Sequence, residues 1–174
     1  MRKAAKADLD YIMTLEYAPQ NVDFIMPFPA ETHEKVLSGN HDNAMDIIVV
    51  EKKSGEPVGY LLVQGLKELG GRVYEWSHII IDKKGVGYGH ETMKLIKAWS
   101  FAVRRAHRLW VDCKDWNERA LHLYESEGLQ REGLHREALF ANGKYDNLVV
   151  LAMLEDEYRE RCRRGLEFTV VAKS

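Results

Sequence analysis

The sequence predicts an α/β domain in which a mixed, strongly twisted central sheet is flanked by helices. Three observations lead to this fold class. The chain has 174 residues, the size of one compact domain. Segments with helical apolar spacing alternate with short β-branched segments typical of strands. Near the C-terminus, two apolar segments flank a tight-turn signal, which predicts an antiparallel hairpin.

Two short helices are expected near the N-terminus. Residues 8–17 carry apolar side chains at helical spacing, and Pro19 closes the segment. A second helix is expected over residues 31–37, where Thr32 is a suitable cap and Gly39 a suitable end. Any strand that precedes the first helix must be short, because this helix begins so close to the start of the chain.

Three strands are expected in the middle of the chain. Residues 45–50 and 58–66 are apolar and rich in β-branched side chains, and a Ser-Gly-Glu-Pro turn joins them into a hairpin. The pair Gly70-Gly71 predicts another reversal before a strand at residues 72–81. The tail of that strand consists of Ile79, Ile80 and Ile81, which suggests burial on both faces of the sheet.

A glycine-containing loop and a long helix follow this strand. The loop runs over residues 84–89, and the helix extends to about residue 105. The side chains expected on the apolar face of the helix are Met93, Ile96, Trp99 and Val103.

The last third of the chain predicts a strand, a helix and a hairpin. The strand is expected at residues 109–113, and the helix after it has Asp115 and Glu118 at capping-box spacing and Gly128 at its end. Asn142-Gly143 is the dipeptide that best tolerates the positive φ angles of a type I′ turn. The hairpin strands are expected at 134–140 and 145–154, before a charged helix at 155–164.

Composition and charge argue against several classes of protein. The chain has 25 Lys and Arg against 27 Asp and Glu, so its net charge of -2 lacks the positive surface of a dedicated nucleic-acid binder. No apolar segment approaches the roughly 20 residues needed to cross a membrane. Only two cysteines are present, which suits a reducing cytoplasm better than a secreted disulfide scaffold. We therefore expect a soluble, cytoplasmic protein.

The loop that contains Gly85, Gly87 and Gly89 is the first candidate for ligand binding. Glycines at the start of a helix leave backbone N–H groups uncovered where the helix dipole is positive, and this arrangement binds phosphate. The loop lacks the Gly-Lys-Ser/Thr end of a Walker A loop and the Gly-x-Gly-x-x-Gly spacing of a dinucleotide site. A tightly packed connection without a ligand is the alternative interpretation.

Two segments carry a resemblance to a known family. The loop Lys84-Gly85-Val86-Gly87-Tyr88-Gly89 resembles the Arg/Gln-x-x-Gly-x-Gly/Ala acyl-CoA loop of the GNAT N-acetyltransferases. The segment at residues 117–129 resembles their Asn-x-x-Ala-x-x-Leu-Tyr-x-x-x-Gly-Phe block almost position for position. The hairpin with Asn142-Gly143 is similar to that of the ribosomal-protein and polyamine acetyltransferase branches, whereas the connection Asp82-Lys83 is shorter than usual.

This resemblance implies a single GNAT-like domain over residues 1–174 that uses acetyl-CoA as its acyl donor. Residues 1–45 would form the acceptor side, 46–158 the acyl-CoA-binding core and 159–174 a tail. The strand before the loop would bind the pantetheine arm through its backbone, and the loop would bind the pyrophosphate. The implied acetyl-CoA-binding residues are Ile79, Ile80, Ile81, Lys84, Gly85, Val86, Gly87, Tyr88, Gly89, His90, Asn117 and Tyr124.

The alternative role of Asn117 is that of a turn or helix-capping asparagine.

The resemblance also implies direct transfer of the acetyl group from the thioester to an amine in a ternary complex. Tyr124 is the candidate acid, because a phenol holds its proton at neutral pH and can pass it to the departing thiolate. For the base, the ribosomal-protein acetyltransferases imply a carboxylate at the place of Asp112, and Glu75 is the competitor. Cys113 is expected to be a small packing residue rather than a nucleophile.

The acceptor stays open at this point. A protein N-terminus and a small amine or polyamine are the two candidates, and a CoA-binding sensor without turnover is the alternative from another class. Glu31 and Glu34 could attract a cationic acceptor, although an acidic helix face is usually solvated surface. The seven histidines show no metal-ligand spacing, so no metal is expected. The C-terminal hairpin could supply an edge for a homodimer.

Overall fold

The computed structural model describes residues 1–67 and 72–168. Within these residues, a seven-stranded sheet has the order β1-β2-β3-β4-β5-β7-β6. Neighbouring strands are antiparallel except β4 and β5, which run parallel, and this confirms the predicted mixed sheet. The strands are β1 (Arg2–Lys3), β2 (Ala44–Val50), β3 (Pro57–Gln64), β4 (Val73–Ile81), β5 (Arg108–Lys114), β6 (Gln130–Ala141) and β7 (Lys144–Leu154).

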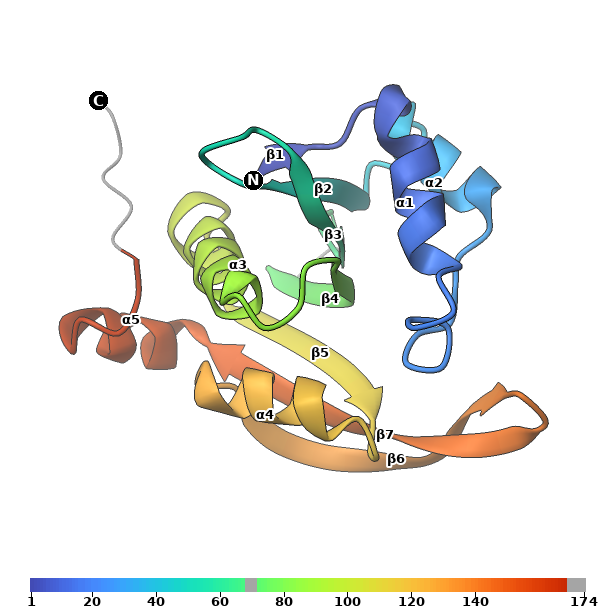
Figure 1. Cartoon of the computed structure of the whole chain (residues 1–174). Helices are drawn as coiled ribbons and strands as arrows, with labels where there is room; N and C mark the ends of the chain where they lie inside the picture. The colour runs from blue at the N-terminus through green and yellow to red at the C-terminus, as the bar shows by residue number, and fades with distance from the viewer. Residues whose placement is uncertain (68–71, 169–174) are drawn as a thin grey trace.

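Helices cover both faces of this sheet (Figure 1). Ile12 of α1 and Val36 of α2 pack on one face of β2, β3 and β4. Met93 of α3 and Leu121 of α4 pack on the opposite face. The helices are α1 (Leu9–Glu16), α2 (Ala30–Leu37), α3 (Tyr88–Ala98), α4 (Glu118–Ser126) and α5 (Glu155–Arg163), with a short 3-10 turn (Lys6–Asp8) before α1. None of the helices in the described ranges is long and apolar enough to cross a membrane.

Two predicted helix caps are wrong, although the helices themselves are confirmed. Pro29 rather than Thr32 precedes α2, and Thr32 lies inside the helix. Asn117 rather than Asp115 caps α4, because its side-chain oxygen accepts a hydrogen bond from the backbone N–H of Ala120 at 3.2 Å. The cap must stand directly before the first helical turn to reach that N–H group, which Asp115 does not do.

The end of the long helix also differs from the prediction. After Ala98 the chain continues as a π-helical turn over Trp99–Val103. A wider turn rotates the side chains that follow it. Phe101 is therefore buried, whereas Val103, which was predicted on the apolar face, is 54% exposed. The predicted reversal at Gly70-Gly71 lies outside the described residues.

The parallel strands β4 and β5 pair only over a short stretch. Residues 73–75 are in register with residues 108–110, and the pairing stops there. β5 continues beside β7 while β4 stays beside β3, so the two parallel strands diverge. Residues 76–81 therefore have no strand partner on the β5 side within the described part of the chain. The diverging ends leave a gap in the middle of the sheet.

A β-bulge in β4 changes which side chains face each layer. The register between β3 and β4 shifts so that Ser77 is the extra residue. Before the bulge, Trp76 packs on the side of α3, whereas Ile80 after the bulge packs on the side of α1 and α2. His78 is turned toward α1 in the same way, where it contacts Glu16.

The C-terminal hairpin agrees with the prediction. Asn142 has a φ of 52° and Gly143 a φ of 76°, which are the left-handed conformations of a type I′ turn. The hairpin places β6 at the outer edge of the sheet. The charged helix that was expected after it is α5.

Candidate active site

The gap between β4 and β5 widens into a cavity of about 650 Å³. The end of β4 forms one wall, and the end of β5 together with α4 forms the opposite wall. The glycine loop lies along one side, and residues 21–28 contribute the remaining cover. A cavity of this size can hold a ligand of cofactor dimensions.

Ile79 and Ile81 correct one expectation about β4. They are half-exposed rather than buried, and only Ile80 between them is fully buried. Alternate side chains of a strand point to opposite faces, and the neighbouring gap leaves one of these faces uncovered. The backbone edge that the prediction assigned to the pantetheine arm therefore faces the cavity.

The loop before α3 has a backbone suited to a phosphate group. Gly87 stands at the N-cap of α3 with a φ of 89°, and Gly85 has a φ of 82°. Within the described part of the chain, no other heavy atom lies within 4 Å of the place where a Cβ would stand on either glycine. The loop thus presents uncovered backbone at the positive end of a helix.

The side chains of this loop are held by other parts of the protein. The Nζ atom of Lys84 lies 3.4 Å from the side-chain oxygen of Asn21, and both residues line the cavity. The hydroxyl of Tyr88 donates a hydrogen bond to Glu51. His90 pairs through Nδ1 with Glu127 at 2.8 Å. Binding by the loop would therefore rest mainly on its backbone.

Tyr124 and Cys113 stand on the wall opposite β4. Burial, together with the neighbouring Cys113 and Asp112, raises the pKa of Tyr124, so the phenol holds its proton at neutral pH. Burial also raises the pKa of Cys113 to about 12. Cys113 is therefore a protonated thiol inside the apolar core, which confirms its predicted role as a packing residue.

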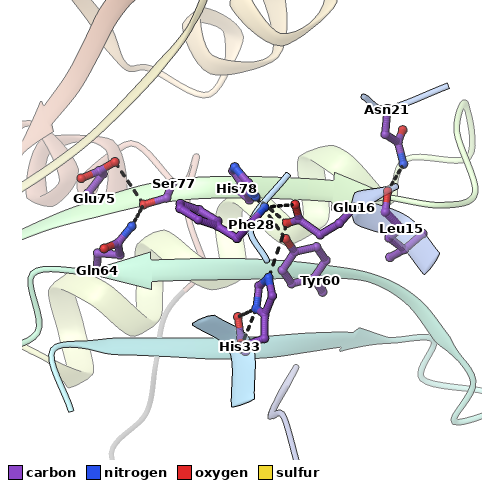
Figure 2. Close-up of polar contacts among 11 residues, drawn as sticks. Leu15, Glu16, Asn21, Phe28, His33, Tyr60, Gln64, Glu75, Ser77 and His78 are labelled. Carbon is purple, nitrogen blue, oxygen red and sulfur yellow. Dashed lines mark hydrogen bonds and ion pairs between the residues drawn. The ribbon is translucent and has the colours of Figure 1, made fainter. Parts of the chain in front are cut away.

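The two carboxylates predicted as base both line the cavity. Burial raises the pKa of Asp112, although the charges of His135 and His78 oppose this rise. Glu75 accepts a hydrogen bond from the Ser77 hydroxyl at 3.0 Å (Figure 2). These contacts place one carboxylate on each wall.

Residues 21–28 are fixed against β5 by a buried lysine. Lys114 donates a hydrogen bond to the carbonyl of Asp23 at 2.7 Å and forms an ion pair with Asp146 at 2.9 Å. Phe24 and Phe28 from this segment line the cavity. The first quarter of the chain therefore supplies an aromatic wall to the cavity.

A comparison with protein families decides what this arrangement is. The sequence profile of the Acetyltransferase (GNAT) family matches residues 11–129, which is more than half of the chain. The chain belongs to the GNAT family of acetyltransferases. Both of the segments that carried the resemblance lie within the matched range.

Characterised relatives of this acetyltransferase align over nearly its whole length. Spermidine N(1)-acetyltransferase of Vibrio cholerae is 25% identical over 166 residues, which cover 92% of the chain and 95% of the relative. The enzyme of the same name from Escherichia coli K12 is 26% identical over 162 residues, 91% of the chain and 87% of the relative.

Solved structures confirm the GNAT fold. The crystal structure of spermidine N-acetyltransferase from Vibrio cholerae in complex with CoA and spermine superposes with a TM-score of 0.81, at 23% identity. The match covers 91% of this chain and 96% of the other.

The GNAT fold brings most of the predicted site residues to one cavity. Tyr124, Asp112 and Glu75 line it, together with nine of the predicted acetyl-CoA contacts: Ile79, Ile80, Ile81, Lys84, Gly85, Gly87, Gly89, His90 and Asn117. Val86 and Tyr88 do not, and the side-chain oxygen of Asn117 is occupied by its capping bond. Glu31 and Glu34 lie outside the cavity, and Glu31 pairs instead with Lys35 at 2.8 Å.

Sequence reasoning missed two residues beside the cavity, His78 and Glu16. His78 lines the cavity, and its Nδ1 lies 2.5 Å from Oε1 of the buried Glu16 (Figure 2). The sequence did contain one signal: His78 stands directly before three isoleucines, in a strand expected to be buried. A polar side chain buried in such a strand requires a hydrogen-bonding partner. The partner itself is 62 residues away, so no local pattern indicates it.

Proposed function

We propose that this N-acetyltransferase moves the acetyl group of acetyl-CoA to a primary amine of a polyamine such as spermidine or spermine. The names of its relatives support this substrate class. The observation that carries the proposal is the cavity, which joins a glycine loop at a helix N-terminus to an aromatic wall and two carboxylates.

The charges along the cavity fit two substrates of opposite sign. Lys83 and Lys84 stand beside the glycine loop, where the diphosphate of CoA would lie. Glu75 and Asp112 stand near the place where β4 and β5 pair. Glu75 is six residues before Ile81, the last residue of β4 and the one nearest the glycine loop. At about 3.3 Å per residue, this separates Glu75 from that end of the strand by about 20 Å. The ammonium groups of a polyamine are attracted to carboxylates and to aromatic faces such as that of Phe28.

We propose direct transfer with Tyr124 as the acid. The raised pKa of Tyr124 supports this role, because the proton is present when the thiolate departs. Asp112 and Glu75 both stay candidates for a negative group that binds the acceptor or removes its proton. Alignment of thioester and amine in one cavity contributes several kcal/mol to catalysis, about 7 or more in favourable intramolecular cases.

Thiol release from acetyl-CoA tests the proposed acceptor. We expect release with spermidine and spermine, and at least tenfold slower release with peptides that have a free N-terminus but no second amine. Faster turnover of the peptides would instead support a protein N-terminus as acceptor. Acetyl-CoA binding without release for every amine would support the CoA-binding sensor and contradict the proposal.

A valine at Gly87 tests the acetyl-CoA end of the cavity. Gly87→Val places a branched side chain in the loop and strains a φ of 89°, so we expect acetyl-CoA binding to be lost. Gly39→Val is the matched control, because Gly39 also has a positive φ and open space but does not line the cavity. Calorimetric titration with CoA should separate the two variants, and tight binding by a folded Gly87→Val protein would contradict this role.

Three further predictions belong to the same proposal. The activity needs no metal, so EDTA should leave the rate unchanged.

The chain forms one domain with an acceptor side at residues 1–45, a core at 46–158 and a tail at 159–174. A homodimer would use the exposed edge of β6, and sedimentation of the β6 variant Phe140→Asp tests this, because Phe140 is exposed.

A further inference from the structure

A chain of four buried ionisable side chains runs from the core to the acceptor wall, and the proposed function does not use it. We name it the acceptor-side chain; its members are Asp46, His33, Glu16 and His78. Their exposed fractions are 1%, 0%, 0% and 7%. Figure 2 shows His33, Glu16 and His78 in sequence beside strands β3 and β4. Only His78 reaches the cavity.

The members contact one another in order. The carboxylate of Asp46 lies 3.1 Å from Nδ1 of His33, and Nε2 of His33 lies 3.9 Å from Oε1 of Glu16. The same Oε1 atom lies 2.5 Å from Nδ1 of His78. The second oxygen of Glu16 accepts a hydrogen bond from the backbone N–H of Phe28 at 3.0 Å.

In the described part of the chain, Glu16 and Asp46 form their ion pairs with histidines. A buried carboxylate is unfavourable unless donors compensate it, and here the donors are the imidazole of His78 and the backbone N–H of Phe28. Among the described residues, no Lys or Arg forms an ion pair with Glu16 or Asp46. The partners of the two carboxylates are therefore histidines rather than side chains with a permanent charge.

The orientation of His78 leaves one nitrogen for the cavity. Nδ1 faces Glu16 at 2.5 Å and the Tyr60 hydroxyl at 3.2 Å. A carboxylate at Nδ1 holds the imidazole in the tautomer whose lone pair is on Nε2. Within the described part of the chain, no hydrogen bond occupies Nε2. The charged group that faces His78 from β5 is Asp112.

We infer that His78 is the general base that removes a proton from the acceptor amine, and that Glu16 is its positioning residue. The inference rests on the proposed function. Nε2 of His78 takes one proton from the ammonium group. The freed electron pair of nitrogen then forms the N–C bond to the thioester carbon, and the C–S bond breaks with its electron pair on sulfur.

Tyr124 completes the proton balance on the opposite wall. Its hydroxyl protonates the departing thiolate, and the second proton that the nitrogen loses on becoming an amide restores the phenol. His78 returns its own proton to solvent. Base and acid then lie on the two walls between which the thioester carbon must sit, whereas Asp112 lies on the same wall as Tyr124 and close enough to raise its pKa.

The pH dependence of His78→Gln tests this assignment. We expect kcat/KM for spermidine to fall by about 100-fold or more near pH 7, the usual contribution of a general base, with the KM for acetyl-CoA unchanged. The loss should shrink as the pH approaches about 10, where amines lose their proton without help. His107→Gln is the matched control, because His107 is an exposed histidine outside the cavity.

Glu16→Gln is the second variant, and it leaves His78 in place. We expect a smaller loss of kcat, about tenfold, with the same change in the shape of the pH profile. Folding is checked by the melting temperature and by acetyl-CoA binding. An equal loss at every pH in both variants would show a structural role and overturn the inference.

The outcomes separate this inference from the proposed function. A wild-type protein that acetylates spermidine, with a His78→Gln variant that matches it at every pH, would overturn only the role of His78. A pH-dependent loss in Asp112→Asn but not in His78→Gln would assign the base to Asp112. A folded wild-type protein that acetylates peptides and no polyamine would contradict the proposed acceptor, and the same pH comparison would then test His78 on the peptide.

Discussion

Two buried groups of charged side chains in this protein differ in the cations that they contain. The acceptor-side chain joins two carboxylates to two histidines. The second group, which we name the Lys97 cluster, lies between α3 and the C-terminal residues. It consists of Lys97, Arg161, Glu127 and Glu167, with His90 at its rim.

The contacts of the Lys97 cluster form a closed network. Lys97 donates to the carboxylate of Glu127 at 3.0 Å, to its carbonyl at 2.7 Å and to Glu167 at 2.6 Å. Arg161 donates to the same oxygen of Glu167 at 2.5 Å. Two permanent cations thus balance two carboxylates. Burial by itself raises the pKa of Glu127, but hydrogen bonds from His90 and Lys97 outweigh it, so this pKa is lowered.

The difference between the two groups indicates a difference in role. Lysine and arginine ordinarily keep their charge across neutral pH, so a network built on them holds one arrangement. Imidazoles gain and lose a proton in this range. We expect the Lys97 cluster to control stability and the acceptor-side chain to control the rate and its pH dependence.

Lys97→Met should give the largest loss of stability. It leaves Glu127 and Glu167 buried with fewer donors, and breaking a buried ion pair in this way costs about 3–5 kcal/mol. Lys35→Met is the matched control on an exposed helix pair and should change the stability very little. Urea unfolding measures both, and equal losses would contradict the assigned role of the cluster.

The pH dependence of this loss can be worked out from Glu127. Because its folded pKa is lowered, its ionised form stabilises the native state above the ordinary pKa of about 4.3, and this contribution disappears as the pH falls through the folded value. The difference between Lys97→Met and the wild type should therefore shrink in acid. A difference that stays constant from pH 7 to pH 3 would contradict the linkage.

Tyr124→Phe should affect the rate instead. Loss of the acid is expected to lower kcat by about 100-fold or more, while acetyl-CoA affinity changes little because the ring stays in place. Stopped-flow thiol release and CoA titration measure the two effects separately. Tyr74→Phe is a control in the same core, because Tyr74 is buried but does not line the cavity. An unchanged kcat would remove Tyr124 as the acid.

His90→Gln sharpens the comparison between imidazoles. His90 belongs to the Lys97 cluster, and its side chain is half exposed, so its pairing with Glu127 contributes less than about 1 kcal/mol. Because the loop would bind through its backbone, we expect acetyl-CoA affinity to stay within about threefold, which is less than 1 kcal/mol. The pH–rate profile should keep its wild-type shape, unlike that of His78→Gln. A changed profile would contradict the distinction between the two groups.

The sequence predicted those parts of the molecule that depend on neighbouring residues. The turn at Asn142-Gly143 and the glycine loop before α3 require particular residues at consecutive positions, and both were predicted correctly. Tyr124 lines the cavity, and it was predicted as a site residue because the block around it resembles a family segment. Local chemistry and a matching block were sufficient in these cases.

The parts that were missed depend on distant contacts. The bulge at Ser77 follows from the register of β3 against β4, and no residue of β4 alone specifies it. The same bulge turns His78 toward Glu16, which comes from a different layer. The expectation of burial for Ile79 and Ile81 failed because the divergence of β4 from β5 is likewise a property of the assembled sheet.

Asp112→Asn should give the smallest effect on stability, and its sign is opposite to that of Lys97→Met. Burial raises the pKa of Asp112, so the folded protein binds this proton more tightly than the unfolded chain does. Ionised Asp112 therefore lowers the free energy of unfolding as the pH rises from about 3.9 through the folded pKa. The asparagine variant does not titrate and should be the more stable protein at pH 7, with the advantage vanishing near pH 3.

Asp42→Asn is a control with the opposite expectation. The hydrogen bond from Lys67 lowers the pKa of Asp42, so its ionised form stabilises the native state at neutral pH and the variant should be slightly less stable there. Urea unfolding at pH 3 and pH 7 measures both variants, and a less stable Asp112→Asn protein at pH 7 would contradict the argument. A gain in stability combined with a loss of rate would show that the carboxylate is retained for the reaction at a cost in stability.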